Sequence, residues 1–323
     1  MKQFTVADFP KLAEQLRQPF QQHYYAMYSS VYGGLVTDPA LMLLPIDDHM
    51  VHRGDGIFEA LKAVRGKIYN LQAHLARLND SARGLHLRLP VTDTELTDLI
   101  RATMRAGARP DCMIRMFVSR GPGGFSVNPY ECPAPQLYIV ATSVGTPFMQ
   151  LHPGGARVRT SRIPAKTAAM AVIKNCNYVP NVLMKQEAVD EGVDFVAGFD
   201  EHGHLTEGAV ENMGIVTQDG RVLFPKLDRI LPGTTMLRVI ELARPLAQTG
   251  EVREVGFADL TREDMLRAAE FLIAGTTINL AAGVEFDGVQ IGTGQPGPVC
   301  RRLAALLEQD MLSNAALLTP VMP

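Results

Sequence analysis

The sequence lacks the features that mark several special classes of protein. It contains no tryptophan, and its 4 cysteines are scattered along the chain without a Cys-x-x-Cys pair. Neither a disulfide framework nor a zinc site is indicated, so we expect reduced thiols and no metal site. The net charge is only −3, without a long basic or acidic block. This pattern argues against binding of nucleic acid by neutralisation of phosphates.

Long apolar runs are also missing. No segment is apolar over the length needed to cross a bilayer, and the N-terminus holds no apolar core of the signal-peptide type. We therefore expect a cytoplasmic protein without membrane contact. What the chain does have is 323 residues, 46% of them hydrophobic and 20% charged. That composition is typical of a globular protein, and the length suits two domains better than one core.

The order of apolar segments predicts an α/β protein with two domains. Short apolar strands alternate with helical patterns over residues 31–140, which is typical of an α/β layer. We assign residues 1–143 to this small N-terminal domain, with residues 1–30 as an extra helical arm. The segment 144–155, which is rich in proline and glycine, is the predicted linker. Residues 156–323 then form a larger, β-rich C-terminal domain, expected to be barrel-like with helices outside.

Hydrophobic periodicity and turn residues predict the individual elements. Glycine-containing turns separate several strands, and proline and glycine mark helix ends. The predicted strands are 41–46, 57–64, 113–119, 137–143, 157–162, 194–200, 212–217, 221–224 and 270–274. The predicted helices are 7–22, 71–85, 93–106, 180–191, 235–248, 261–268 and 297–309.

Lys174 is the first candidate functional residue. It ends the apolar stretch 169–173 and precedes the helix that Pro180 is expected to begin. A lysine held against apolar surroundings has a lowered pKa, because desolvation disfavours the ammonium form. The neutral amine can attack a carbonyl carbon and form an imine. For a single lysine, a solvated side chain at the end of a strand remains the alternative.

Other motifs suit a phosphorylated cofactor. A buried carboxylate at Glu207 would keep the ring nitrogen of an electron-sink cofactor protonated. The steps 230-ILPGTT-235 and 274-AGTTINL-280 offer hydroxyls and backbone N–H groups to a phosphate, the first of them at a predicted helix start. Arg77, on a predicted helix, is a fork-shaped donor for the same group. Each feature alone has an ordinary explanation as a turn carboxylate, a helix-capping threonine or a solvated arginine.

Taken in order along the chain, these motifs resemble those of the class IV aminotransferases. These are fold-type IV enzymes that use pyridoxal 5′-phosphate (PLP), and they include branched-chain aminotransferases, D-amino acid transaminases and 4-amino-4-deoxychorismate lyases. The resemblance covers roughly residues 31 to 310. The matching blocks are 49-HMVHRGDGIFEALKAVRGKIYNLQAHLARLNDSA-82, 174-KNCNYVPNVLMKQEAVDEG-192, 205-LTEGAVENMGIV-216, 230-ILPGTT-235 and 287-DGVQIGTGQPGPV-299.

The resemblance implies a role toward PLP for each candidate. Lys174 would bond covalently to the cofactor and move the proton between the substrate Cα and the cofactor C4′. Glu207 matches the family's partner of the ring nitrogen, and Tyr178 matches a tyrosine near the cofactor oxygen. The phosphate-binding positions match Arg77, Thr234, through its backbone N–H, Thr235 and Thr276.

The same resemblance marks residues for the substrate. Phe58 matches a pocket wall, and Glu59 matches a buried glutamate of the family. Arg115 matches an arginine near the substrate α-carboxylate in branched-chain enzymes. Arg53 stands where those enzymes often carry tyrosine, so it would favour a carboxylate, with an ion pair to Asp55 or another acid as the alternative. The remaining substrate candidates are Arg120 and Thr277.

The implied activity is transfer of an amino group from a branched-chain-like or D-amino acid to a 2-oxo acid. A lyase releasing pyruvate and 4-aminobenzoate, an (R)-amine transaminase and a non-catalytic PLP-binding protein remain alternatives. The loop 119–129 lacks the Arg-x-His pattern of D-amino acid transaminases. Lyases often have threonine where this chain has Glu59 or Ala60, and Met236 stands where many members have arginine. Because family members are usually dimers, we expect a homodimer.

Overall fold

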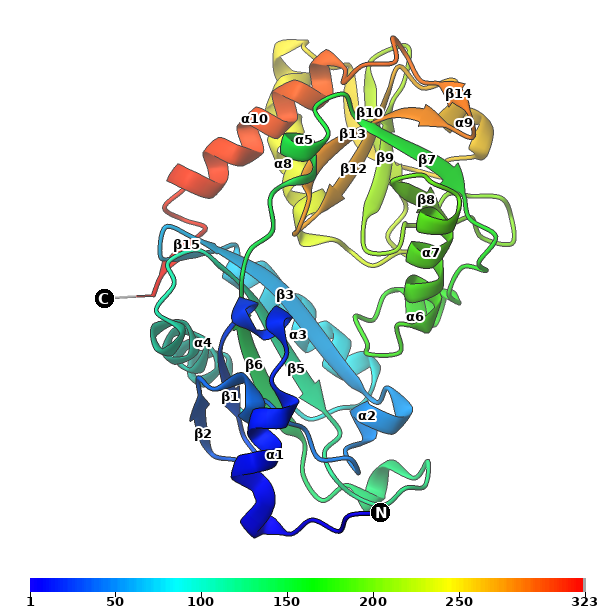
Figure 1. The fold of residues 1–323 in the computed structure, drawn as a ribbon. Helices are drawn as coiled ribbons and strands as arrows, with labels where there is room; N and C mark the ends of the chain where they lie inside the picture. Colours follow the sequence, from blue (N-terminus) through cyan, green and yellow to red (C-terminus); the bar gives the residue numbers. More distant parts are fainter. Residues whose placement is uncertain (322–323) are drawn as a thin grey trace. The chain divides into compact units, whose positions relative to one another are not determined.

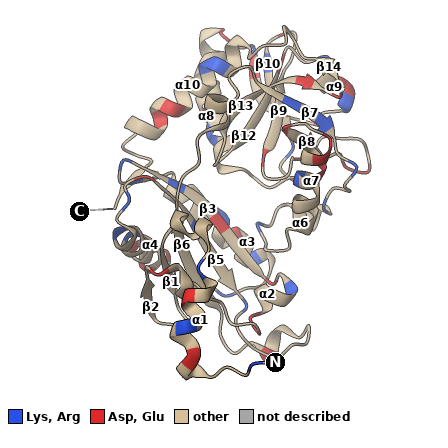
Figure 2. Ribbon diagram, viewed as in Figure 1, with Lys and Arg blue, Asp and Glu red and all other residues tan. Residues whose placement is uncertain are grey.

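A computed structural model describes residues 1–321 of the chain. The chain divides into two compact units, of which the first comprises Met1–Val144 together with the residues from Leu317 onward. The second unit comprises Gly145–Ala316. Each unit combines a β-sheet with helices (Figure 1), as the sequence predicted. Lysine and arginine residues are interspersed with aspartate and glutamate residues over both units (Figure 2).

The first unit is built on a seven-stranded antiparallel sheet with the order β15-β4-β3-β5-β6-β1-β2. Its centre is formed by β3, β5 and β6, three strands that the sequence predicted. The register of β3 and β5 pairs Gly56 with Ser119 and Ala60 with Arg115. The strands are β1 (Tyr24–Ser29), β2 (Gly34–Val36), β3 (Gly56–Val64), β4 (Lys67–Tyr69), β5 (Cys112–Ser119), β6 (Gln136–Thr142) and β15 (Leu318–Pro320).

Two longer helices cover this sheet. Helix α3 packs on β3, and α4 packs on β1 and β6. The start of α4 is fixed by a capping box, in which Thr92 and Glu95 exchange hydrogen bonds with each other's backbone N–H groups. The helices of the first unit are α1 (Phe9–Leu16), α2 (His49–Arg53), α3 (Leu71–Gly84) and α4 (Asp93–Gly107), with 3₁₀ turns η1 (Val6–Asp8), η2 (Pro19–His23), η3 (Pro39–Leu41) and η4 (Pro129–Glu131).

The N-terminal part of the first unit differs from the prediction. The expected helix 7–22 is a shorter α1 flanked by the 3₁₀ turns η1 and η2. The strand predicted at 41–46 is wrong, because η3 and an irregular segment occupy it. The carboxylate of Asp38 accepts a hydrogen bond from the Ala40 N–H at 3.0 Å, which starts the turn. Pro45 then interrupts any strand that follows.

The C-terminal residues return to the first unit. Strand β15 pairs with β4, matching Leu318 with Tyr69 and Pro320 with Lys67. The carbonyl of Pro320 also accepts a hydrogen bond from the Arg101 side chain at 3.1 Å. The sequence-based division, which placed all of 156–323 in the second domain, did not foresee this return.

The second unit contains an eight-stranded mixed sheet, whose main path is β11-β10-β9-β12-β13-β7-β8 with β14 paired to β13. The pairs β10–β11, β13–β7 and β7–β8 are parallel, and the other pairs are antiparallel. Its strands are β7 (Ala156–Thr160), β8 (Phe195–Ala197), β9 (Asn212–Val216), β10 (Arg221–Pro225), β11 (Glu254–Ala258), β12 (Glu270–Gly275), β13 (Asn279–Phe286) and β14 (Val289–Gln290).

Helices flank this second sheet. Helices α8 and α10 pack on each other and on β12. Helix α8 also packs on β11, α10 also packs on β13, and α7 packs on β8. One short helix, α5, lies inside the segment predicted as a linker. The helices are α5 (Phe148–Leu151), α6 (Ala168–Ala171), α7 (Val179–Asp190), α8 (Thr234–Thr249), α9 (Arg262–Leu266) and α10 (Pro298–Ser313). Among the residues from 1 to 321, none of the helices has the length and apolar character of a membrane span.

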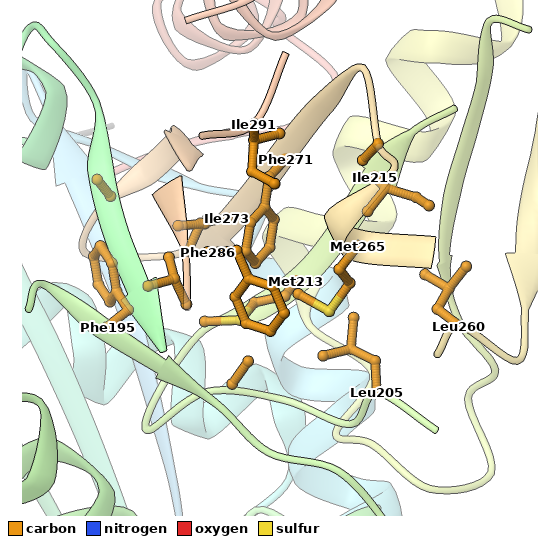
Figure 3. Packing of buried hydrophobic residues seen from close by; sticks show 14 of the residues in the cluster. Phe195, Leu205, Met213, Ile215, Leu260, Met265, Phe271, Ile273, Phe286 and Ile291 are labelled. Carbon is orange, nitrogen blue, oxygen red and sulfur yellow. The ribbon is translucent and has the colours of Figure 1, made fainter. Parts of the chain in front are cut away.

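Phenylalanine rings pack among aliphatic and methionine side chains in the core of the second unit (Figure 3). The rings of Phe271 and Phe286 meet edge to face, with centroids 5.9 Å apart. A Cβ at Gly283 would lie 2.7 Å from the Phe271 ring. Glycine in β13 therefore lets the ring lie directly against the strand, and a larger residue would force the core apart.

Candidate functional site

Lys174 lies on a short loop between α6 and α7. The side chain of Asn175 shapes this loop, since its Nδ2 donates to the Ile173 carbonyl at 3.2 Å and its Oδ1 accepts from the Asn177 N–H at 3.0 Å. Lys174 is half-buried beside the buried Ile173. Its Nζ lies 3.5 Å from the Tyr178 hydroxyl. The loop therefore holds the amine next to a phenol, where it can exchange hydrogen bonds and protons.

A second lysine approaches the same tyrosine. The Nζ atoms of Lys166 and Lys174 lie 5.3 Å and 5.7 Å from the centroid of the Tyr178 ring, close enough for a cation–π attraction. Lys166 also forms an ion pair with Glu207, with 3.0 Å between Nζ and Oε1, and only 16% and 15% of the two side chains are exposed. Lys166 was not foreseen from the sequence, because nothing in its local segment distinguishes it from a solvated lysine.

Glu207 connects this cluster to the turn that precedes α8. Its second oxygen, Oε2, accepts a hydrogen bond from the Leu231 N–H at 3.1 Å. The carboxylate is thus held at one oxygen by Lys166 and at the other by the backbone. Each carboxylate oxygen has two acceptor positions, so Glu207 can also accept a proton-bearing ring nitrogen.

The two Gly-Thr-Thr steps lie near the edge of the second sheet where β9 begins and β12 ends. Helix α8 begins at Thr234 directly after Gly233, and Thr276 follows the end of β12. Strand β12 runs antiparallel to β9, and Ala274 pairs with Asn212. The N–H groups in the first turn of a helix are not used in its own hydrogen-bond ladder, and they favour anions. Together with the threonine hydroxyls, this helix start can bind a phosphate group.

Arg77 belongs to the first unit, where it lies on α3 and is buried. Its Nε and Nη2 donate to the two oxygens of Glu59 at 2.7 Å and 2.8 Å. His74 Nδ1 lies 2.7 Å from Glu59 Oε2. Burial acts to raise the pKa of Glu59, but Arg77 and His74 outweigh it and hold that pKa well below the usual range. The ionised glutamate therefore fixes the plane of the guanidinium.

Comparison with known proteins places the chain in a family. The model of the amino-transferase class IV family matches residues 56–285. The chain belongs to this family. It is 36% identical over 294 residues to the chloroplastic D-amino-acid transaminase of Arabidopsis thaliana, covering 91% of this chain and 78% of the relative. It is 30% identical over 268 residues to the branched-chain-amino-acid aminotransferase of Pseudomonas aeruginosa, covering 79% and 83%.

Solved structures agree with this assignment. The branched-chain amino acid aminotransferase of T.th., solved with pyridoxamine 5′-phosphate, matches with a TM-score of 0.85 and 27% identity, covering 93% of this chain and 99% of that one. The protein is therefore a PLP-dependent class IV transaminase of fold type IV, which confirms the prediction from the resemblance. Its substrates are an amino acid and a 2-oxo acid.

The second unit of the transaminase fits PLP chemically. It holds an amine at Lys174, a carboxylate at Glu207 and a helix start at Thr234. The turn before that helix start is closely packed, since a Cβ at Gly233 would lie 1.8 Å from the Asn212 Oδ1 atom. A glycine is thus required where the backbone approaches the position expected for the phosphate.

Two candidate substrate residues share one face of the first unit's sheet. Ala60 lies directly opposite Arg115, and Phe58, two residues before Ala60, points to the same face because side chains alternate along a strand. Arg115 donates from Nη1 to the Thr142 hydroxyl at 2.7 Å. Lys62 lies on this face as well, and burial lowers its pKa to about 8. The face therefore combines an aromatic ring with two basic side chains, which suits an apolar substrate that carries a carboxylate.

The other arginines predicted for the substrate have different surroundings. Arg120 donates to both oxygens of Asp55 at 3.0 Å and to two backbone carbonyls after α3. These contacts favour a structural role, because they hold the loop after β5 onto the rest of the first unit. Arg53 is exposed and donates to the carbonyls of His52 and Phe125. Asp55 thus pairs with Arg120, and the ion pair considered between Arg53 and Asp55 is not formed.

Sequence reasoning also missed a buried acid beside Glu207. Glu211 accepts a hydrogen bond from the Val210 N–H at 3.0 Å, and burial raises its pKa to about 7. It was visible in the block 205–216, but no sequence signal shows that this carboxyl group points into the protein. Met236, where many family members have arginine, is fully buried in α8.

Proposed function

We propose that Lys174 is the catalytic residue of this transaminase. The observation that carries the proposal is the position of its amine, on the loop shaped by Asn175 and 3.5 Å from the Tyr178 hydroxyl. PLP supplies an electron sink when it is bound. Lys174 Nζ would act first as general base, taking the proton from the substrate Cα, and then as general acid, giving a proton to the cofactor C4′. Tyr178 orients that amine through its hydroxyl group.

The proposed cofactor contacts divide into a ring end and a phosphate end. Glu207 holds the proton on the ring nitrogen, a role supported by its fixed and mostly buried carboxylate. The phosphate would be bound by side chains and backbone N–H groups at two turns, supported by the helix start of α8 and by the strand end of β12. The proposed phosphate residues at these turns are Thr234, Thr235 and Thr276. Arg77, on α3 of the first unit, is proposed from the resemblance alone, because its Nε and Nη2 donate to Glu59.

As the amino donor we propose a branched-chain-like amino acid or a D-amino acid. Relatives with both kinds of name match this chain over most of its length. Phe58 would contact the apolar part of the substrate and Arg115 its carboxylate. Arg53 and Thr277, both exposed, are the remaining proposed contacts. The contacts of Arg120 support a structural role in place of the one first expected for it.

The test is an absorption spectrum of the purified protein with PLP, followed by separate additions of four amino acids. L-leucine, L-glutamate, D-alanine and D-glutamate each convert the visible band if they donate their amino group. A band that responds to leucine and glutamate of the L series supports the branched-chain reading, whereas a response to the D series alone supports the other. If none responds, release of pyruvate from aminodeoxychorismate would identify the lyase alternative, and conversion of an (R)-amine would identify the amine transaminase.

A lysine control separates the proposed role of Lys174 from a general effect of losing a charge. Lys174→Ala should lose the visible band and all activity. Lys185→Ala, at an exposed position on α7, should keep both. A persistent band in the Lys174→Ala protein would overturn the assignment of the catalytic residue.

We also propose that the protein is a cytoplasmic homodimer. All four cysteines are free thiols, which suits a reducing compartment. Large apolar side chains are exposed in the N-terminal part of the first unit, as expected for a surface that another subunit covers. They include Phe4, Val6, Leu16, Phe20, Leu41, Leu43, Leu44 and Ile46. Sedimentation velocity should give twice the chain mass, and a single-chain mass at micromolar concentration would contradict the dimer.

A further inference from the structure

Asn212 lies where the two candidate phosphate turns come together. It is the first residue of β9 and is 7% exposed. On one side it pairs with Ala274 of β12, the strand that leads directly into the Gly275-Thr276-Thr277 step. On the other side its amide reaches the turn before α8. No sequence motif had singled it out as a functional residue.

The amide of Asn212 holds that second turn by its backbone. Its Nδ2 donates to the Leu231 carbonyl at 2.9 Å. The N–H of the same Leu231 donates to Glu207 Oε2 at 3.1 Å. Leu231 is therefore held at both its N–H and its carbonyl by two side chains that flank the turn 208–211.

The amide also packs under the glycine of the turn. A Cβ at Gly233 would lie 1.8 Å from Asn212 Oδ1, so the backbone at this glycine lies directly against the amide. The next residue, Thr234, begins α8. The direction in which α8 starts therefore depends on a contact between Asn212 and the backbone of residues 231 to 233.

We propose that Asn212 is a positioning residue for the phosphate of PLP. In this role it acts through the backbone of the turn. Asn212 fixes the turn at 231–235 relative to the turn at 275–277. The N–H groups and hydroxyls of the two turns then converge on one phosphate, and phosphate binding does not have to order them. Preorganised donors bind more tightly, because the ordering free energy is not subtracted from the binding free energy. The inference rests on the proposed phosphate contacts and deepens them.

The experiment compares two cofactors that differ only in the phosphate. The dissociation constants of PLP and of pyridoxal are measured by absorbance titration of the full-length, cofactor-free protein. For Asn212→Ala we expect PLP to bind about tenfold more weakly, as for the loss of one hydrogen bond to an ordered turn. Pyridoxal should bind within about twofold of wild type, because its ring contacts do not pass through Asn212. The ratio of the two constants is the readout, and a general loss of structure would not change it.

A matched control and a second variant complete the design. Asn314→Ala removes a side-chain hydrogen bond to Asp310 in the same unit and should leave the ratio unchanged. Gly233→Ala places a methyl group against Asn212 Oδ1 and should raise the ratio of the PLP dissociation constant to the pyridoxal dissociation constant, as Asn212→Ala does. The double variant should lose little more than either single variant, since both break the same contact.

The outcomes separate this inference from the proposed function. If wild type binds PLP no more tightly than pyridoxal, the proposed phosphate site itself is wrong. If wild type discriminates and both variants keep that discrimination, only the role of Asn212 is overturned. The role of Asn212 is also overturned if each variant weakens the binding of PLP and of pyridoxal equally. Should Asn212→Ala not fold, Gly233→Ala alone decides, because a ratio equal to wild type would refute the positioning role.

Discussion

Replacing Glu211 with glutamine should change how the stability of the protein depends on pH. Burial raises the pKa of this carboxyl group from 4.5 to about 7, a difference of about 2.5, with Glu207 adding to the shift and Val210 N–H and Lys185 opposing it. The folded protein therefore binds this proton more tightly than the unfolded chain does. A shift of that size corresponds to about 3 kcal/mol. The stabilisation of the folded protein by this proton is complete below about pH 4.5 and is lost as the pH rises through about 7.

The assay is urea denaturation of cofactor-free protein between about pH 4.5 and about pH 8. Circular dichroism follows unfolding, because the chain has no tryptophan. The free energy of unfolding of Glu211→Gln, relative to wild type, should rise by up to about 3 kcal/mol across this window. The exposed Glu254 provides the control, and Glu254→Gln should show no such rise. If the relative stability of Glu211→Gln is constant with pH, the carboxyl group does not titrate as its burial implies.

Three further measurements test other parts of the structure. Glu59→Gln should lower the free energy of unfolding by about 3–5 kcal/mol, because it removes the carboxylate from a buried pair with Arg77; a loss below about 1 kcal/mol in denaturation would contradict a buried pair. Burial raises the pKa of the Cys112 and Cys300 thiols to about 12. Mass spectrometry should therefore show that iodoacetamide alkylates them more slowly than the half-buried Cys132 and Cys176. Equal rates at all four thiols would contradict this prediction. Burial also lowers the pKa of Lys62 to about 8 from 10.5. The stability of Lys62→Met relative to wild type should therefore fall as the pH rises between those values, and a constant difference would speak against it.

Helices were predicted well where their ends are marked in the sequence. The capping residues Thr92 and Glu95 stand three positions apart, and Pro180 lies in the first turn of α7. Strand β13 was missed, because 279–286 shows no alternation and is interrupted by Gly283. The missing alternation follows from burial of the strand, and the glycine follows from the close approach of the Phe271 ring to Gly283. Only the fold reveals these two causes. The false strand at 41–46 has apolar residues, but its backbone pairs with no strand of the sheet.

The candidate site was predictable where residue types and order carry it. Lys174 and Glu207 stand in blocks that resemble the class IV aminotransferases. Lys166 was not predictable, because its ion pair with Glu207 joins residues 41 positions apart. The pairing of Asp55 with Arg120 also depends on the fold. The register that sets Gly56 against Ser119 brings their outer neighbours together, and no local pattern selects Arg120 over Arg53.

The return of β15 has a consequence for how the protein is synthesised. The edge strand that pairs with Lys67–Tyr69 is translated only after all of Gly145–Ala316. Until then, β4 remains an open edge with unpaired backbone groups, which other strands can bind. The ribosome therefore releases the last strand of the first sheet after the complete second unit has been made. A chain truncated before Leu318 would leave that edge exposed and prone to aggregation, even though both helices on the sheet are intact.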